Sequence, residues 1–190
     1  KTIEYNTFLS SLLKEKYSIA ICGSHGKTSS VGMLTYLLKS FNPSYLRGDG
    51  MGKWTDSKYF IFEACEYQNH FLEYEPNEII ILNIDYDHND YFKSKNAYKN
   101  SFKNFVKKAK NRVYLYDKIK GIKGKNIFKF GSNSFSFSNI ITIEKETIFS
   151  IDFKDFTIDN IIVKLHHPKL INNILGLMLC SLYLGVSKDE

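Results

Sequence analysis

The sequence predicts an α/β fold with a mostly parallel, doubly wound sheet flanked by helices, and with a small antiparallel β patch in its second half. Helix-like and strand-like segments alternate through residues 1–116, as they do in doubly wound sheets. Two apolar runs, at 59–62 and 79–82, lack polar alternation, which is typical of strands buried on both faces. A glycine-containing loop follows the first strand-like run and precedes a helix-like one.

The first half of the chain alternates between the two kinds of segment. Apolar residues at helical spacing, such as Phe8 and Leu12, open the chain. After the loop, Val31, Leu34 and Leu38 recur on one helical face. In order, the pattern predicts a helix at 2–16, a strand at 17–22, a helix that stops at 42–43, strands at 59–62 and 79–82, a helix at 95–110 and a strand at 112–116.

Beyond residue 121 the pattern changes to short aromatic or β-branched runs that are separated by turn residues. A turn with His166 and His167 then precedes a last helix, whose apolar stripe begins at Leu170 and which ends at 184–185. The short runs predict strands of the antiparallel patch at 126–130, 134–137, 147–153 and 156–163.

The composition is typical of a single globular domain over residues 1–190. Hydrophobic residues make up 43% and charged residues 24%, as in ordinary soluble domains that fold without disulfides or metal. The net charge is +6, but the lysines are scattered, and the run 103–112 fits a solvated helix face. We therefore expect neither nucleic acid nor membrane as a partner. The 3 cysteines are far apart, which favours a reducing cytoplasm over a zinc site or a disulfide framework.

The loop at 23–30 carries the strongest chemical signal. It reads Gly-Ser-His-Gly-Lys-Thr-Ser-Ser between a predicted strand and a predicted helix, where backbone N–H groups and the positive helix end can hold a polyphosphate. Lys27 would neutralise phosphate charge and the Thr28 hydroxyl would bind Mg²⁺. The alternative is a tight turn with a surface lysine. The predicted sheet is thus of the P-loop type, although the common spacing would need glycine at Ile21.

Polar segments follow the two buried strands. Residues 62–67 read Phe-Glu-Ala-Cys-Glu-Tyr, and residues 83–92 read Asn-Ile-Asp-Tyr-Asp-His-Asn-Asp-Tyr-Phe. Because the carboxyl ends of parallel strands meet at one edge of a sheet, we expect Thr28, Glu63 and His88 at the same edge. A carboxylate there is a hard oxygen ligand that suits Mg²⁺. The alternatives are a solvated carboxylate and a hydrogen-bonded loop histidine.

These three segments resemble motifs in the central ATP-binding domain of the Mur ligase family. His25 matches the form of the loop in the alanine-adding and muropeptide-recycling members. The segment at 62–67 is similar to that of Gram-positive alanine-adding members, and the segment at 83–92 resembles the Asn-x-x-x-Asp-His signature of the family. Residues 47–53 resemble the Gly-Asp-Gly-x-Gly-Lys loop that faces the UDP-sugar in this family. The chain departs from the family at Gln68 and Asn69, where arginines are usual, and in the segment before Asn173.

The resemblance implies a set of site residues. Lys27, Glu63 and His88 would be catalytic, and Thr28 would join Glu63 and His88 as Mg²⁺ ligands. The substrate contacts would be Lys53, Glu66 and His70. The ATP contacts would be Gly23, Ser24, His25, Gly26, Lys27, Thr28, Ser29, Asn83, Asp87 and Asn173.

The resemblance also implies an activity. The chain would be the central domain of a ligase that uses ATP and Mg²⁺ to join L-alanine to UDP-N-acetylmuramate through an acyl phosphate, in peptidoglycan synthesis. Residues 1–190 would lack the family's N-terminal UDP-sugar domain and its C-terminal domain, so they would bind Mg-ATP weakly and would not ligate alone. Three alternatives stay open: a muropeptide-recycling ligase, a folylpolyglutamate synthase-like ligase, and a nucleotide-binding module that has lost catalysis.

Overall fold

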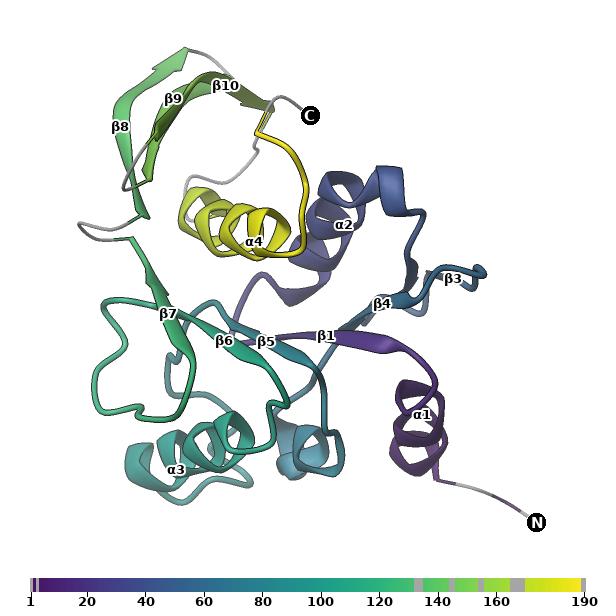
Figure 1. Cartoon of the computed structure of the whole chain (residues 1–190). Helices are drawn as coiled ribbons and strands as arrows, with labels where there is room; N and C mark the ends of the chain where they lie inside the picture. Colours follow the sequence, from purple (N-terminus) through teal and green to yellow (C-terminus); the bar gives the residue numbers. More distant parts are fainter. Residues whose placement is uncertain are drawn as a thin grey trace.

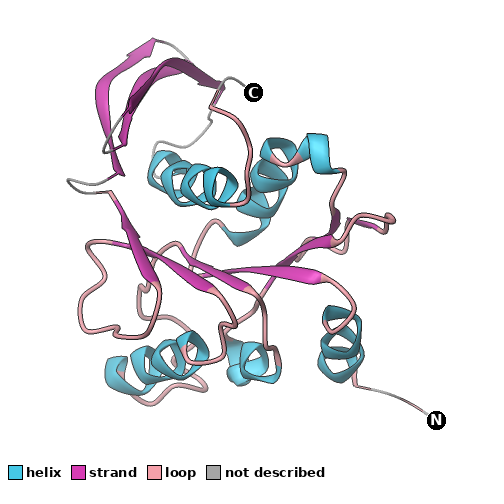
Figure 2. Cartoon of the chain, viewed as in Figure 1, coloured by secondary structure: helices cyan, strands magenta, loops and turns pink. Residues whose placement is uncertain are grey.

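The structure, a computed structural model, describes residues 2, 4–131, 135–143, 146–153, 156–164 and 170–188. A seven-stranded sheet with helices on both faces occupies the middle of the molecule, and a three-stranded sheet lies at one end (Figures 1 and 2). The elements are α1 (Tyr5–Leu13), β1 (Tyr17–Cys22), α2 (Lys27–Leu37), the 3-10 helix η1 (Lys39–Phe41), β2 (Ser44–Leu46), β3 (Gly52–Lys53), β4 (Tyr59–Glu63), the 3-10 helix η2 (Tyr67–Glu73), β5 (Glu78–Ile81), α3 (Lys95–Val106), β6 (Arg112–Tyr116), β7 (Ile127–Phe130), β8 (Phe135–Ile143), β9 (Glu146–Phe153), β10 (Phe156–Lys164) and α4 (Ile171–Tyr183).

The main sheet has the strand order β3-β2-β4-β1-β5-β6-β7. All neighbouring strands pair in parallel except β2 and β3, which confirms the predicted mostly parallel sheet. β1 lies between β4 and β5, so the segments that follow these three strands leave the sheet at the same edge. This order places the loop after β1 between the two polar segments that the sequence analysis singles out.

Two details of the predicted strands are wrong. Residues 127–130 pair in parallel with β6, so this run extends the main sheet and does not belong to the antiparallel patch. The sequence shows a short β-favouring run there but not which sheet it joins. The strands β2 and β3 are not predicted, although a hairpin turn is an alternative for residues 47–53, because strands this short have too few positions to show a period.

Helices cover both faces of the main sheet (Figure 1). α2 and α4 pack on one face, and α1, α3 and η2 pack on the other. Alternate residues of β1 point to opposite faces: Ile19 and Ile21 join the core under α2 and α4, whereas Ala20 and Cys22 join the other core. The central strands are therefore buried on both faces, as their unbroken apolar runs predict.

The small sheet has the order β10-β9-β8 and is antiparallel throughout, which confirms the predicted patch. Phe135, Phe149 and Ile151 from this sheet share a core with Leu177 of α4. The small sheet thus packs on the same side of the main sheet as α4 (Figure 1).

α4 lies within the predicted last helix. The predicted turn at His166 and His167 lies outside the described residues. In the described parts of the chain, no helix combines the length and the apolar character needed to cross a membrane.

Candidate functional site

Glycine shapes the loop between β1 and α2 at two positions. Gly23 has a φ of +139°, and a side chain there would lie 3.0 Å from the backbone oxygen of Asn83. Gly26 caps α2 with a φ of +82°, and a side chain there would lie 2.5 Å from the amide nitrogen of Asn173. Only glycine fits both conditions. The loop therefore brings the free N–H groups at the start of α2 next to the segment after β5 and the start of α4.

Two side chains fasten the loop to the segment after β5. The Asn83 carboxamide accepts a hydrogen bond from the His25 N–H at 2.9 Å and donates one to the His25 carbonyl at 3.0 Å. The Ser24 hydroxyl donates to the Asp85 carbonyl at 2.6 Å and accepts from the Asp85 N–H at 2.9 Å. The loop is thus ordered by the chain itself, which lowers the cost of ordering it around a ligand.

Glu63 ends β4, and its carboxylate faces the first turn of α2. The Thr28 hydroxyl donates to Glu63 Oε2 at 2.7 Å, and the Gly48 N–H donates to the same oxygen at 2.9 Å. Gly48 belongs to the turn of the β2–β3 hairpin, so the 47–53 loop contacts the site through this residue. Thr28 and Glu63 present two hard oxygen donors side by side, which suits Mg²⁺.

Glu66 follows β4 and is 0% exposed. Lys27 Nζ lies 3.0 Å from Glu66 Oε2 and also donates to the Gly23 carbonyl at 2.7 Å. His88 Nε2 lies 3.4 Å from Glu66 Oε1. The structure therefore brings Lys27 and His88 together, and it does so through a glutamate that the sequence analysis places among the substrate contacts.

Tyr98 on α3 is a residue of the site that no motif in the sequence marks. Its hydroxyl lies 2.9 Å from Ser24 Oγ and 3.3 Å from Glu66 Oε1, where it donates. The residue is 1% exposed, and burial raises the pKa of its phenol above the ordinary value, so the hydroxyl stays protonated at neutral pH. Helical spacing places Tyr98 on the apolar face of its helix. The only sign of another role in the sequence is that its side chain carries a hydroxyl group, which needs a hydrogen-bond partner when it is buried.

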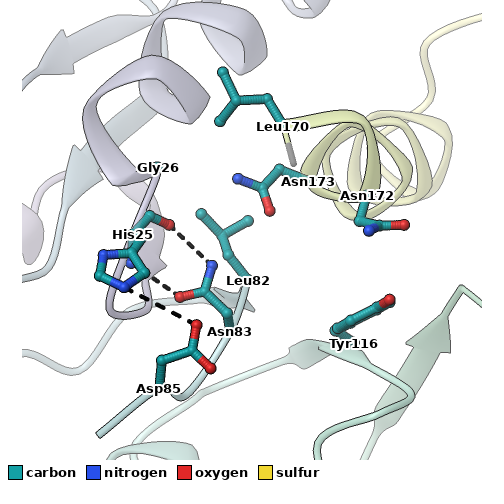
Figure 3. A pocket seen from close by; sticks show the side chains of 9 residues that line it. All are labelled: His25, Gly26, Leu82, Asn83, Asp85, Tyr116, Leu170, Asn172 and Asn173. Carbon is teal, nitrogen blue, oxygen red and sulfur yellow. Dashed lines mark hydrogen bonds and ion pairs between the residues drawn. The ribbon is translucent and has the colours of Figure 1, made fainter. Parts of the chain in front are cut away.

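A cavity of about 590 Å³ opens beside the loop (Figure 3). Figure 3 shows His25 and Asn83 on one side of the cavity, and Asn173 and Tyr116 on the other. Asp85 adds a carboxylate whose Oδ2 lies 4.0 Å from His25 Nε2. Carboxamides, an aromatic ring and apolar atoms together suit a planar heteroaromatic ligand. The family resemblance predicts Asn173 beside a nucleotide, whereas no motif in the sequence marks Tyr116.

Four other predicted site residues lie around this centre. Ser29 is exposed on the first turn of α2, and Asp87 accepts the His88 N–H at 2.7 Å. Lys53 is exposed on the edge strand β3 and donates to an asparagine amide oxygen at 3.3 Å. The His70 ring lies 6.5 Å from the ring of Tyr67. The structure leaves the predicted roles of these residues as predictions.

The residues predicted to bind metal divide between two contacts. Thr28 pairs with Glu63, whereas His88 lies at Glu66. Among the residues that the structure describes, no three His, Cys, Asp or Glu side chains are arranged to hold a metal ion. A pair such as Thr28 and Glu63 still fits Mg²⁺, because this ion commonly takes one or two carboxylates and completes its shell with water and phosphate oxygens.

The sequence is similar to known ligases. Residues 49–176 match the family described as Mur ligase middle domain. The chain is 32% identical over 195 residues to the UDP-N-acetylmuramate--L-alanine ligase of Lactiplantibacillus plantarum, and the alignment covers 98% of this chain and 45% of that protein. This chain therefore spans less than half the length of that relative.

Solved structures share the fold. A ligase from Neisseria meningitides, UDP-N-acetylmuramate:L-alanyl-gamma-D-glutamyl-meso-diaminopimelate ligase, matches with a TM-score of 0.82 at 20% identity, over 96% of this chain and 66% of that one. MurF ligase from Thermotoga maritima in complex with ADP matches with a TM-score of 0.78 at 16% identity, over 98% of this chain and 53% of that one. Since the middle-domain match extends over most of its length, this chain belongs to the Mur ligase family.

Proposed function

We propose that this chain is the nucleotide-binding domain of an ATP-dependent ligase that joins L-alanine to UDP-N-acetylmuramate in peptidoglycan synthesis. The observation that carries the proposal is the meeting of Lys27, Thr28 and Glu63 at an ordered strand–loop–helix turn. The activity named for the Lactiplantibacillus relative supports the choice of substrates. The ADP held by the Thermotoga relative supports a nucleotide at the loop.

The nucleotide would lie along the loop with its phosphates at the start of α2. The N–H groups of residues 23–29 would face the phosphates, and Lys27 would turn from Glu66 to them. Asn83 and Asp87 would orient the segment after β5. The adenine would enter the cavity between His25 and Asn173, which is the part of the site with an apolar and carboxamide lining.

Thr28 and Glu63 would hold Mg²⁺, which would screen the negative phosphates from an incoming carboxylate. His88 would serve as a further Mg²⁺ ligand from its position beside Glu66. Lys53 and His70 would contact the substrate at the rim of the site, and Glu66, buried behind Lys27, would act on the substrate only through its neighbours.

The proposed reaction has two steps. An oxygen of the UDP-N-acetylmuramate carboxylate attacks the γ-phosphorus, the bond from that phosphorus to the bridging oxygen breaks, and ADP leaves. The amine of L-alanine then attacks the acyl carbon, and phosphate leaves as the amide forms and the amine gives up a proton. Lys27 would stabilise the negative charge of the transferred phosphoryl group.

Residues 1–190 would supply only the middle of the enzyme. A UDP-sugar domain and a further domain that closes over the nucleotide would complete it, in agreement with the greater length of the Lactiplantibacillus relative. The cytoplasm is the proposed location, since ATP and the UDP-sugar are found there.

The test is ADP release by the complete gene product that contains this chain. We expect release to require UDP-N-acetylmuramate and L-alanine together. Release that requires a peptide in place of L-alanine would identify a muropeptide ligase, and release that requires a folate and glutamate would identify a folylpolyglutamate synthase-like enzyme. Binding of ATP without release under any of these conditions would indicate a domain that has lost catalysis.

Glu63→Gln tests the metal assignment in the same assay. We expect Mg²⁺-dependent ADP release to fall about 100-fold, because one oxygen of the proposed metal site is lost. The matched control is Glu75→Gln, which changes an exposed glutamate away from the loop. Wild-type turnover in Glu63→Gln, with an unchanged unfolding midpoint, would overturn the assignment.

A further inference from the structure

A chain of buried polar groups connects Ser24 of the loop to Lys27 by way of α3. Tyr98 reaches the loop from the face of the main sheet opposite to α2 (Figure 1). Its hydroxyl lies 2.9 Å from Ser24 Oγ and 3.3 Å from Glu66 Oε1. Lys27 Nζ lies 3.0 Å from the second oxygen of Glu66. The Lys27 side chain is only 12% exposed and that of Glu66 is 0% exposed, so water contributes little to the pair.

The Tyr98 hydroxyl has one proton and two acceptors within reach. The Ser24 hydroxyl already donates its own proton to the Asp85 carbonyl and accepts from the Asp85 N–H. Its remaining capacity is therefore for accepting a hydrogen bond. Tyr98 donates to Glu66 Oε1 at 3.3 Å and lies closer, at 2.9 Å, to Ser24 Oγ, so its single proton is shared between the two acceptors, and a rotation about the C–O bond shifts it toward either one.

The partners of Glu66 depend on where Lys27 is. Glu66 Oε2 is buried and makes no hydrogen bond with good geometry in this structure, so the Lys27 charge 3.0 Å away is its compensation. Without that charge, the carboxylate would keep only His88, at 3.4 Å, and Tyr98. A buried carboxylate that loses a partner is strongly destabilised unless other donors satisfy it.

We infer that Tyr98 is a positioning residue for nucleoside triphosphate binding: its hydroxyl, which lies between Ser24 and Glu66 in this structure, donates fully to Glu66 when Lys27 leaves Glu66 for the phosphates. Glu66 holds Lys27 in the empty loop, and Tyr98 satisfies Glu66 in the occupied one. The ligand class is a polyphosphate, because only a strong anion competes with Glu66 for Lys27. This inference rests on the proposed function, since it takes Lys27 to be the phosphate-binding lysine.

Tyr98→Phe tests the inference, because it removes the hydroxyl and keeps the buried ring. We expect the affinity of the complete protein for Mg-ATP, measured by titration calorimetry, to fall about 10-fold, as for a lost hydrogen bond to a charged group. The matched control is Tyr74→Phe. Tyr74 is 2% exposed and its hydroxyl donates to Asn6 of α1 at 2.7 Å and not to a residue of the loop, so its loss should leave the affinity unchanged.

The Glu66→Gln background separates positioning from a merely structural role. A neutral amide needs no countercharge, so Tyr98→Phe should change the Mg-ATP affinity less than 2-fold in that background. An equal loss in both backgrounds would show that the Tyr98 hydroxyl acts through a partner other than Glu66, such as Ser24, and would overturn the inference. An unchanged Mg-ATP affinity in the single variant Tyr98→Phe would also overturn the inference.

Glu66→Gln by itself gives a second test that does not need Tyr98→Phe to fold. The inference predicts Mg-ATP binding as tight as wild type or tighter, because the amide competes less for Lys27. A fall of more than 10-fold would show that Glu66 is part of the phosphate site and would overturn the inference. If the wild-type protein itself does not bind Mg-ATP, the proposed function fails instead, so the two failures are distinct.

Discussion

Two glutamates of the main sheet are equally buried but are held in different ways. Glu78 opens β5 at the amino edge of the sheet, and Glu66 follows β4 at the carboxyl edge. Both side chains are 0% exposed. Each contacts a long basic side chain and a tyrosine hydroxyl: Arg112 and Tyr17 at Glu78, and Lys27 and Tyr98 at Glu66, which also lies 3.4 Å from His88 Nε2.

The geometry of the two cations differs. Arg112 Nε donates to the two oxygens of Glu78 at 3.0 and 3.2 Å, and its terminal nitrogen donates at 2.7 Å. Glu78 and Arg112 are also direct neighbours in the parallel pairing of β5 and β6. Lys27 instead divides its ammonium group between Glu66 and a loop carbonyl.

The difference separates a structural ion pair from an exchangeable one. A guanidinium fork that donates to both carboxylate oxygens is fixed in direction, and its strand position fixes its distance. An ammonium group on a flexible stem can turn to a new anion while its backbone stays in place. We therefore expect the pair at Glu78 to contribute mainly to stability, and the pair at Glu66 mainly to binding.

Arg112→Ala should produce the largest loss of stability. Removal of the guanidinium leaves Glu78 buried without a cation, which should lower the free energy of unfolding by about 3–5 kcal/mol. Urea denaturation would measure the change. Lys110→Ala, an exposed change nearby, should stay within about 0.5 kcal/mol. If Arg112→Ala lost only about 0.5 kcal/mol, like the control, the assignment of this pair as structural would be contradicted.

Lys27→Met should weaken Mg-ATP binding strongly and stability only slightly, the reverse of Arg112→Ala. The loss of stability should be about 1 kcal/mol, since His88 and Tyr98 still contact Glu66. The Mg-ATP affinity should fall about 10- to 100-fold, because a charge-assisted contact to phosphate is lost. Calorimetry and urea denaturation of the same variant would give both values. If Lys27→Met unfolds as readily as Arg112→Ala, the two pairs do not differ in kind.

Gly48→Ala should affect binding with little effect on stability. A side chain at Gly48 would lie 2.4 Å from Glu63 Oε2, so the carboxylate must move away from Thr28. The carboxylate is the end of a flexible side chain, and we expect a stability loss of at most about 0.5 kcal/mol. The Mg-ATP affinity should fall several-fold. Gly32→Ala is the control, because a side chain there meets nothing within 4 Å.

The sequence predicts the parallel sheet and the loop because their signals are local. Strands buried on both faces appear as unbroken apolar runs, and the loop is a contiguous Gly-Lys-Thr segment after such a run. Thr28, Glu63 and His88 are placed at one edge because each follows or faces the end of a parallel strand. These inferences need only the order of the elements along the chain.

The contacts inside the site join residues that are far apart in the sequence, so the sequence alone does not predict them. Tyr98 and Glu66 are 32 positions apart, and a tyrosine on the apolar face of a helix gives no sign that its hydroxyl meets a buried carboxylate. The family resemblance likewise predicts Glu66 as a substrate contact, whereas the side chain is buried beside Lys27. Which residues share a buried contact depends on how α3 docks on the sheet, and periodicity does not determine that.

Tyr17→Phe should give the smallest effect, and it tests the amino-edge pair through pH. Burial, and then the hydrogen bond to Glu78, raise the pKa of Tyr17 to about 12. An unfolded chain ionises its tyrosines near about 10. Because the folded pKa is the higher one, the contribution of the Tyr17 hydroxyl to stability is complete below about pH 10 and is lost as the pH rises through about 12.

The measurement is the difference in urea midpoint between wild type and Tyr17→Phe. This difference should be constant from neutral pH to about pH 9 and should shrink toward pH 12, because only the wild type loses the contribution. Other buried tyrosines, such as Tyr74, titrate in both proteins and cancel. A difference that stays constant to pH 12 would mean that Tyr17 does not share its proton with Glu78, and Arg112 alone would then hold this glutamate.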